Sequence, residues 1–253
     1  MDPKTSCRKR EPLPASISVV IPAYNEEKRL PQTLQRVQAY LDSSERDWEL
    51  IVVDDGSRDG TAALVAAAAA ENPRIRLVSN PGNRGKGYAV RNGMLAAKGA
   101  WRLYSDADLS APIEDLEKLE AHVQREDADI AIGSRAVDRS LVSVHQSKFR
   151  EMSGRFFNRV MRKITGLPFS DTQCGFKLFR AEAAECVFQR QLLDGFSFDV
   201  EDLVIAKALG LKAVETPVRW ANVEGTKVSL FNGLRSFQDL LQIRSHERAG
   251  RYQ

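Results

Sequence analysis

The chain has 253 residues, of which 43% are hydrophobic and 28% are charged, and its formal net charge is +3. These values are ordinary for a globular protein, and so slight a charge gives no reason to expect a nucleic-acid partner. No apolar run approaches the roughly 20 residues of a membrane-spanning helix, and residues 1–14 lack the apolar core of a secretory signal. The three cysteines form no C-x-x-C pair, so we expect free thiols, no zinc site and a cytoplasmic location.

Residues 1–14 are predicted to form a disordered basic arm, followed by a single domain over residues 15–248. Inside this domain, short apolar strands alternate with amphipathic helices. The predicted strands cover residues 17–21, 50–53, 75–78, 100–104, 130–132 and 213–220. The predicted helices cover residues 31–42, 62–70, 88–98, 112–126, 149–164 and 230–246, and a further helix starts within 198–202. Pro22 is expected to break the first strand, and residues 171–177 are expected to form a loop.

Near-continuous apolar strands that alternate with helices are typical of an α/β fold. The predicted architecture is a Rossmann-like, mostly parallel sheet with helices on both faces. In such sheets, ligands bind beyond the carboxyl ends of the strands. Polar clusters follow four of the predicted strands: Tyr24-Asn25-Glu26, Asp54-Asp55-Gly56-Ser57, Asp106-Ala107-Asp108 and Ser134-Arg135. We therefore predict that these clusters converge on one crevice.

The most informative of these clusters follows the strand at 100–104, where Asp106 and Asp108 stand one residue apart. This spacing can bring both carboxylates to one hard cation, Mg²⁺ or Mn²⁺, which prefers oxygen ligands and keeps other positions for water or phosphate. A cation held in this way can neutralise the charge that develops on a departing diphosphate. The alternative is an ordinary solvated acidic loop.

Two sets of three segments carry a resemblance to a known family. Residues 20–27, 53–57 and 106–108 resemble the corresponding segments of family 2 glycosyltransferases, which have the GT-A fold. Residues 171–179, 198–201 and 224–227 are more specifically similar to the dolichyl-phosphate β-glucosyltransferase branch, whose close relatives are polyprenyl-phosphate mannosyltransferases. The resemblance implies a nucleotide-sugar-binding half at 15–135 and an acceptor-side half at 136–248.

For the donor, the resemblance implies that Asp55 contacts the uracil or ribose and that the loop around Lys86 faces the phosphates. A carboxylate can accept hydrogen bonds from the uracil N–H or a ribose hydroxyl, which suits Asp55. The implied donor-binding residues are Pro22, Tyr24, Asn25, Glu26, Asp55, Gly85, Lys86, Asp106 and Ala107. Two plainer interpretations stay open. Residues 54–57 can be a strand-to-helix turn, and residues 83–87 can be a turn with solvated cations.

For the acceptor, two chemistries make different demands. A hydroxyl acceptor requires a general base, for which Asp199, Glu201 and Asp202 are the candidates, although all three can equally be acids that complement the first turn of a helix. A phosphate monoester is already largely dianionic at neutral pH and needs cations instead. The residues predicted to hold the acceptor are Arg135, Arg150, Gln173 and Lys177. The predicted catalytic residues are Asp106, Asp108, Arg135, Asp199 and Glu201.

Together, these features predict a metal-dependent inverting glycosyltransferase that moves a hexose, glucose by resemblance, from a UDP-sugar to a polyprenyl or dolichyl phosphate. The alternatives are a GDP-mannose-using mannosyltransferase, a transferase acting on a soluble or glycan hydroxyl, and a nucleotide-sugar-binding protein without turnover. The helices at 149–164 and 230–246 can lie at an anionic membrane surface or pack on the core. Peripheral contact at the inner face of a membrane therefore stays open, as does the oligomeric state.

Overall fold

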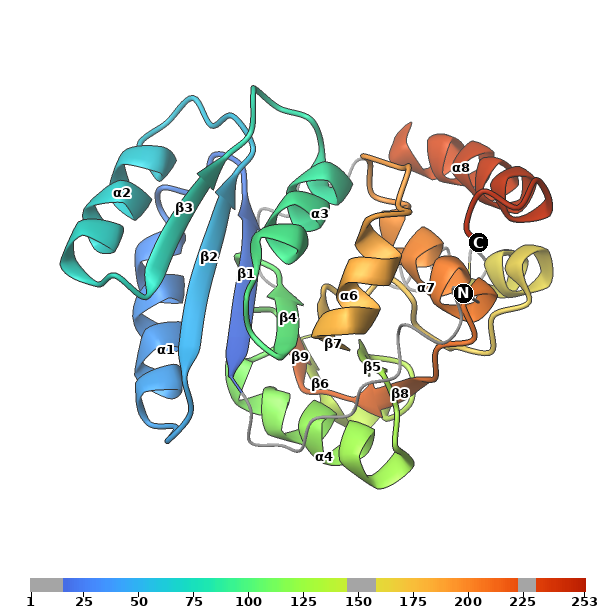
Figure 1. The fold of residues 1–253 in the computed structure, drawn as a ribbon, viewed down its shortest axis with the longest axis horizontal. Helices are drawn as coiled ribbons and strands as arrows, with labels where there is room; N and C mark the ends of the chain where they lie inside the picture. The colour runs from blue at the N-terminus through green and yellow to red at the C-terminus, as the bar shows by residue number, and fades with distance from the viewer. Residues whose placement is uncertain (1–15, 145–157, 223–230) are drawn as a thin grey trace.

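The computed structural model describes residues 16–144, 158–222 and 231–253. A seven-stranded sheet in the order β3-β2-β1-β4-β7-β5-β8 forms its centre (Figure 1). Its strands are β1 (Ile17–Ala23), β2 (Trp48–Asp54), β3 (Ile75–Ser79), β4 (Trp101–Ser105), β5 (Ile130–Ser134), β7 (Phe176–Arg180) and β8 (Ala213–Pro217). All neighbours are parallel except β7, which is antiparallel to both β4 and β5. A small second sheet pairs β6 (Val142–Val144) with β9 (Trp220–Ala221).

Helices cover both faces of this sheet. On one face lie α1 (Leu30–Asp42), α2 (Thr61–Glu71) and α4 (Leu116–Glu126), which starts from a 3-10 turn at Ile113–Asp115. On the other lie α3 (Lys86–Ala96), α6 (Ala181–Phe188) and α7 (Phe198–Ala208), with α8 (Phe231–Arg248) packed on α7. Residues 158–165 are also helical, and a 3-10 turn spans Arg139–Leu141. The predicted mostly parallel sheet with helices on both faces is confirmed.

The protein has two hydrophobic cores, one on each face of the sheet, because the side chains along each strand alternate between the two faces. Val19 and Ile21 of β1 belong to the core under α1, whereas Val20 belongs to the core under α3. Successive side chains of a strand point to opposite faces, so an apolar run buried on both sides needs helices above and below it.

Pro22 does not break the first strand as predicted, because β1 continues to Ala23. Proline lacks the N–H that a sheet ladder uses, so it is tolerated only where that donor has no partner. The pairing of β1 with β4 covers only Ile17 to Val20, whereas pairing with β2 continues through Pro22 to Ala23. Pro22 therefore lies beyond the end of the β4 ladder.

The antiparallel strand β7 is the main element that the sequence patterns do not predict. The loop expected at 171–177 ends at Gly175, and Phe176 begins β7 between β4 and β5. The predicted strand at 213–220 is likewise divided into β8 and β9. Because β7 runs against its neighbours, its first residue lies at the carboxyl edge of β4 and β5, paired with Ser105. The loop before β7 is therefore brought to that edge.

The apolar stripes of the last helices are partly accounted for by packing. Met161, Leu240 and Ile243 are fully buried in the core, whereas Leu241 is 63% exposed. Among the described residues, no helix combines the length and apolar character needed to cross a bilayer. Peripheral membrane contact stays a prediction.

The expectation of free thiols throughout is wrong at Cys186. Cys186 on α6 is disulfide-bonded, whereas Cys174 is free and buried. Burial raises the pKa of the Cys174 thiol to about 12, so this side chain stays protonated and unreactive at neutral pH. Cysteine spacing along the chain carries no information on which thiols meet in space.

Candidate active site

The site lies where the strand order reverses, between the carboxyl ends of β1 and β4. From β1, the chain first adds β2 and β3 on one side and then returns to place β4 on the other. Such a switch point leaves a crevice, because the connections leave the two neighbouring strands in opposite directions. Residues 24–26 follow β1 and residues 106–108 follow β4, so both predicted clusters flank this point.

Asp106 and Asp108 form a tight acidic turn after β4. The side chain of Asp106 is 35% exposed, and Asp108 Oδ1 accepts a hydrogen bond from the Ser110 N–H at 2.9 Å. Ala107, between them, is buried, and its carbonyl accepts a hydrogen bond from Thr33 Oγ1 at 2.7 Å. This last bond ties the turn to α1 and fixes the backbone that carries both carboxylates.

Lys86 forms an ion pair with the first of these acids. Its Nζ lies 2.6 Å from Asp106 Oδ1 and 5.8 Å from the centroid of the Phe198 ring. Burial alone would lower the pKa of Lys86, but the negative charges of Asp106 and Asp199 have the larger effect. The net result is a pKa above the ordinary value of a lysine. Lys86 is therefore a cation at neutral pH, held at the first residue of α3.

Asp55 holds the loop that presents Lys86. The carboxylate is buried at the end of β2, where Oδ1 accepts from the Arg84 N–H at 3.0 Å and Oδ2 accepts from the Gly85 N–H at 2.8 Å. Gly85 has φ of +110°, and a Cβ there would lie 2.4 Å from the Asp194 carbonyl oxygen. Asp55 thus reaches Asp106 indirectly, through this loop and Lys86. A direct contact of Asp55 with the nucleotide stays a prediction.

Arg135 follows β5 and forms a bidentate ion pair with Asp171. Its Nε donates to Asp171 Oδ2 at 2.6 Å and its Nη2 to Oδ1 at 2.8 Å. The guanidinium carbon lies 5.4 Å from the centroid of the Trp220 ring. Burial alone would lower the pKa of Arg135, but the negative charge of Asp171 has the larger effect, so the net result is a raised pKa. The exposed Gln173 belongs to the same turn, where its N–H donates to Asp171. Two of the four residues predicted to hold the acceptor, Arg135 and Gln173, therefore lie in one turn at the carboxyl edge of the sheet.

Lys177 does not face an acceptor as predicted. It lies in β7, is completely buried, and its ammonium donates to the Asp199 carboxylate, to the Tyr104 hydroxyl at 2.6 Å and to the Cys174 carbonyl at 3.1 Å. These three acceptors use all three ammonium protons. Asp199 is only 3% exposed and also accepts from the Tyr104 hydroxyl. Neither residue is free to bind an acceptor or to take its proton.

Glu201 is also unsuited to its predicted role as a base. It is completely buried on α7, and its carboxylate accepts from the Leu193 N–H at 2.8 Å, the Leu192 N–H at 3.2 Å and the Tyr252 hydroxyl at 2.7 Å. Burial raises the pKa of Glu201, an effect that these hydrogen bonds oppose. The carboxylate fastens the segment before α7 and the end of the chain to that helix.

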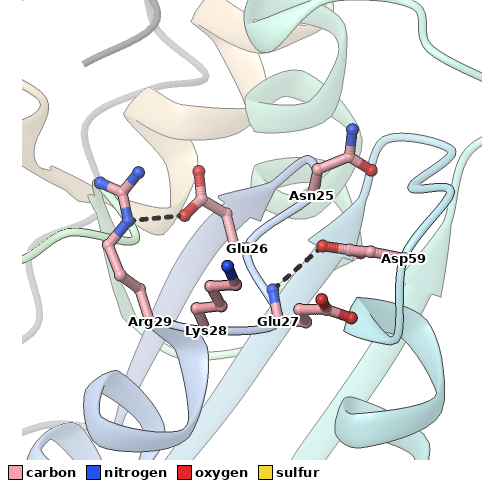
Figure 2. Close-up of a pocket in the computed structure, with 6 residues that line it drawn as sticks. All are labelled: Asn25, Glu26, Glu27, Lys28, Arg29 and Asp59. Atoms are coloured by element: carbon pink, nitrogen blue, oxygen red, sulfur yellow. Dashed lines mark hydrogen bonds and ion pairs between the residues drawn. The ribbon is translucent and has the colours of Figure 1, made fainter. Parts of the chain in front are cut away.

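The loop after β1 opens on a polar pocket of about 280 Å³ (Figure 2). Asn25 has φ of +53° and is held there by its neighbours: its N–H donates to Ser57 Oγ and its Oδ1 accepts from the Arg58 N–H. Figure 2 shows Glu26 facing Arg29, with which it forms an ion pair of 3.1 Å. The pocket is lined by Asn25, Glu26, Glu27, Lys28, Arg29 and Asp59. Two predicted donor residues thus border an open pocket beside the switch point, next to Tyr24 and Pro22.

Some predicted residues fall outside the part of the chain that the structure describes. They include Arg150, most of the helix expected at 149–164 and the segment 224–227 that carries part of the family resemblance. The prediction that Arg150 holds the acceptor is therefore untested.

The sequence matches Glycosyl transferase family 2 over residues 18–188. It is 37% identical over 249 residues to a dolichyl-phosphate beta-glucosyltransferase of Trichomonas vaginalis, covering 95% of this chain and 76% of that relative. The human dolichyl-phosphate beta-glucosyltransferase is 36% identical over 241 residues, covering 90% of this chain and 74% of that relative. The chain belongs to glycosyl transferase family 2. It is therefore a glycosyltransferase, as the resemblance implied.

Solved structures agree on the fold of this family 2 glycosyltransferase. Glucosyl-3-phosphoglycerate synthase from Mycobacterium tuberculosis, in complex with Mn²⁺, UDP and glucosyl-3-phosphoglycerate, superposes with a TM-score of 0.67 at 20% identity, covering 92% of this chain and 81% of that one. Mannosyl-3-phosphoglycerate synthase from Rubrobacter xylanophilus gives 0.69 at 17% identity, covering 94% and 76%. The predicted single GT-A domain is confirmed.

The two acids after β4 fit a hard divalent cation. They supply oxygen ligands and two negative charges, and Asp106 already holds a cationic group in the form of Lys86. Within the described ranges, no group of three or more Asp, Glu, His or Cys side chains is placed to hold a metal. Asp55 therefore does not join them, and the remaining positions around a cation would be filled by water or by donor phosphate. When bound, the cation would stabilise the departing diphosphate.

Sequence reasoning missed three residues that shape this family 2 site. Tyr104 anchors the buried charge pair, Asp171 orients Arg135, and Gly175 lies directly against Asp106. Asp171 and Gly175 lie in the segment that carries the family resemblance, but no role was assigned to them. A glycine immediately before a buried strand does carry a signal, because it often marks a close approach of another group to the backbone.

Replacing Gly175 by alanine is expected to impair the site more than the fold. A Cβ there would lie 2.2 Å from Asp106 Oδ2. The carboxylate can swing away, so we expect the free energy of unfolding to change by less than about 1 kcal/mol. Misplacing by about 1 Å an oxygen that we expect to ligate the metal should lower transfer activity about 100-fold. Gly195→Ala is the control, since no atom lies within 4 Å of its added Cβ. Equal activities of the two variants would contradict this assignment.

Proposed function

We propose that this glycosyltransferase moves glucose from UDP-glucose to dolichyl phosphate or a similar polyprenyl phosphate, with inversion at the anomeric carbon. The observation that carries the proposal is that the acceptor side presents an exposed cation, whereas the candidate bases are buried. The carboxylates that were candidate bases, Asp199, Glu201 and Asp202, are all buried, whereas Arg135 lies at the edge with its side chain 31% exposed. A phosphate acceptor needs cations rather than a base, because it is already anionic at neutral pH.

The relatives support the same substrates. Eight dolichyl-phosphate beta-glucosyltransferases, from Trichomonas to yeast, fly, mouse and human, are 33–37% identical to this chain over most of its length. The structurally similar glucosyl-3-phosphoglycerate synthase of Mycobacterium tuberculosis, 20% identical to this chain, has been crystallised with Mn²⁺, UDP-glucose and phosphoglyceric acid. UDP-glucose as the donor fits both comparisons, and a phosphate as the acceptor rests on the dolichyl-phosphate relatives.

In the proposed reaction, an oxygen of the acceptor phosphate attacks the anomeric carbon of glucose from the face opposite the diphosphate. A new carbon–oxygen bond forms as the bond to the UDP β-phosphate oxygen breaks, and UDP leaves with that electron pair. Asp106 and Asp108 would hold the divalent cation, which would stabilise the negative charge of the departing diphosphate. Asp171 occupies Nε and Nη2 of Arg135, and the remaining guanidinium N–H groups are available to orient the acceptor phosphate.

A donor and acceptor screen tests the proposal. The purified protein is incubated with Mn²⁺ or Mg²⁺, with UDP-glucose or GDP-mannose, and with a short polyprenyl phosphate or the matched polyprenol, which lacks only the phosphate. We expect β-linked glucose on the polyprenyl phosphate and no transfer to the polyprenol. Transfer only from GDP-mannose, or only to hydroxyl groups, would reject the proposed substrates. UDP binding without turnover on any acceptor would favour a binding protein instead.

A further inference from the structure

The ion pair between Lys86 and Asp106 occupies the same carboxylate that we assign to the metal. Lys86 Nζ lies 2.6 Å from Asp106 Oδ1, and the two side chains are 19% and 35% exposed. An ammonium and a divalent cation repel one another, so they cannot share one carboxylate oxygen at contact distance without a large electrostatic cost. A metal that binds Asp106 must therefore displace Lys86 or bind more weakly because of it.

The backbone of Lys86 is fixed, whereas its side chain is long and flexible. The N–H groups of the two preceding residues are held by Asp55, and a Cβ on the next residue, Gly87, would lie 2.6 Å from the Leu193 carbonyl oxygen. The lysine stem has four rotatable carbons, so the ammonium can swing by several ångströms while the loop stays in place. Lys86 also begins α3, and the N-terminus of a helix attracts anionic groups such as phosphate.

We propose that Lys86 is a cationic placeholder at Asp106, displaced by the divalent metal and then taken up by the donor diphosphate. The exchange leaves neither Lys86 nor Asp106 without an oppositely charged partner at either stage. Before binding, the ammonium neutralises Asp106. Afterwards, the metal neutralises Asp106 and the ammonium faces phosphate oxygens. The inference deepens the proposed function, since it uses a metal at Asp106 and a nucleoside diphosphate donor.

The exchange makes metal and nucleotide binding cooperative. Metal binding alone loses the Lys86 ion pair without replacing it, and nucleotide binding alone leaves Lys86 attached to Asp106. Only when both bind does the ammonium regain a partner. Each ligand must then strengthen the binding of the other by the same factor, as linkage requires.

Lys86→Met tests the exchange because methionine keeps most of the side-chain volume and removes the charge. Mn²⁺ binding is measured from the electron paramagnetic resonance signal of the free ion, with and without UDP. We expect the variant to bind Mn²⁺ about tenfold more tightly than the native protein in the absence of UDP. We also expect the factor by which UDP strengthens Mn²⁺ binding to fall about tenfold.

Two further variants separate charge from packing and position. Lys86→Arg keeps a cation and should retain most of the native coupling between Mn²⁺ and UDP. Lys98→Met removes an exposed lysine just before β4, at the opposite end of that strand from Asp106, and should leave Mn²⁺ binding unchanged.

The Mn²⁺ binding and transfer measurements distinguish three outcomes. Native-like Mn²⁺ affinity and coupling in Lys86→Met would overturn the placeholder role. Absence of Mn²⁺ binding in every variant, with or without UDP, would overturn both the placeholder role and the metal assignment. If the expected Mn²⁺ shifts occur but no sugar is transferred to polyprenyl phosphate, the placeholder role stands and the proposed acceptor fails.

Discussion

Replacing Asp108 by asparagine is expected to lower metal-dependent transfer by about 100- to 1,000-fold, on the scale measured for losing one group that stabilises transition-state charge. Asparagine keeps the shape of the side chain and can still accept the hydrogen bond from the Ser110 N–H, which is 2.9 Å in the native protein. The change therefore removes one negative charge and leaves the turn after β4 intact. We expect the melting temperature to stay within a few degrees of the native value.

The chain offers a matched control for this substitution. Asp138 also accepts from a serine N–H two residues on, that of Ser140 at 3.0 Å, but it is exposed and lies outside the site. Asp138→Asn should leave transfer unchanged. Initial rates are measured across a range of Mn²⁺ concentrations, because loss of a ligand should also raise the metal concentration needed for half-maximal activity. Native rates and native Mn²⁺ dependence in Asp108→Asn would remove this residue from the metal site.

The first half of the sheet could be predicted because each strand there is a short apolar run followed by a polar turn. The strand β7 could not. Its sequence, FKLFR, places a lysine at the second of its five positions, and a charged residue argues against burial unless a partner is known. That partner is Asp199, 22 residues further along the chain. A contact between two such distant residues leaves no periodic signal in the sequence.

The candidate site also has a part that could be predicted from the sequence and a part that could not. Clusters at strand ends placed the acidic turn and Arg135 at the correct edge, because parallel strands end together. The orientation of acids on a helix was not predictable in this way. Asp199 and Glu201 fit a solvated first turn equally well by sequence, yet every residue of α7 from Phe198 to Ala206 is buried. That no acid of α7 is accessible depends on packing around the helix, including its contacts with α8, which no local pattern records.

Lys177→Met should destabilise the protein by about 3–5 kcal/mol, a large part of the 5–15 kcal/mol that stabilises a typical domain. The cost arises mainly from Asp199, whose carboxylate would remain buried after losing its ammonium partner. The free energy of unfolding is measured by urea denaturation. As a control, Lys212→Met removes an exposed lysine paired with Glu126 at 3.7 Å and should cost at most about 1 kcal/mol.

The double variant Lys177→Met, Asp199→Asn should recover much of this loss, because no unpaired charge remains and Tyr104 can still donate to the asparagine oxygen. Recovery would show that the pair stabilises the fold by mutual neutralisation. If the double variant were as unstable as the two single variants combined, the pair would not be coupled, and the buried network would need another explanation.

The same double variant decides between a structural and an acceptor-binding role for Lys177. Because the native ammonium is fully buried and its three protons are donated to Asp199, Tyr104 and Cys174, a refolded core without it should bind polyprenyl phosphate normally. We expect the KM for the acceptor to stay within about threefold of the native value. A rise of tenfold or more, in a variant whose stability and UDP affinity are native-like, would mean that the lysine leaves its buried partners during the reaction and reaches the acceptor phosphate.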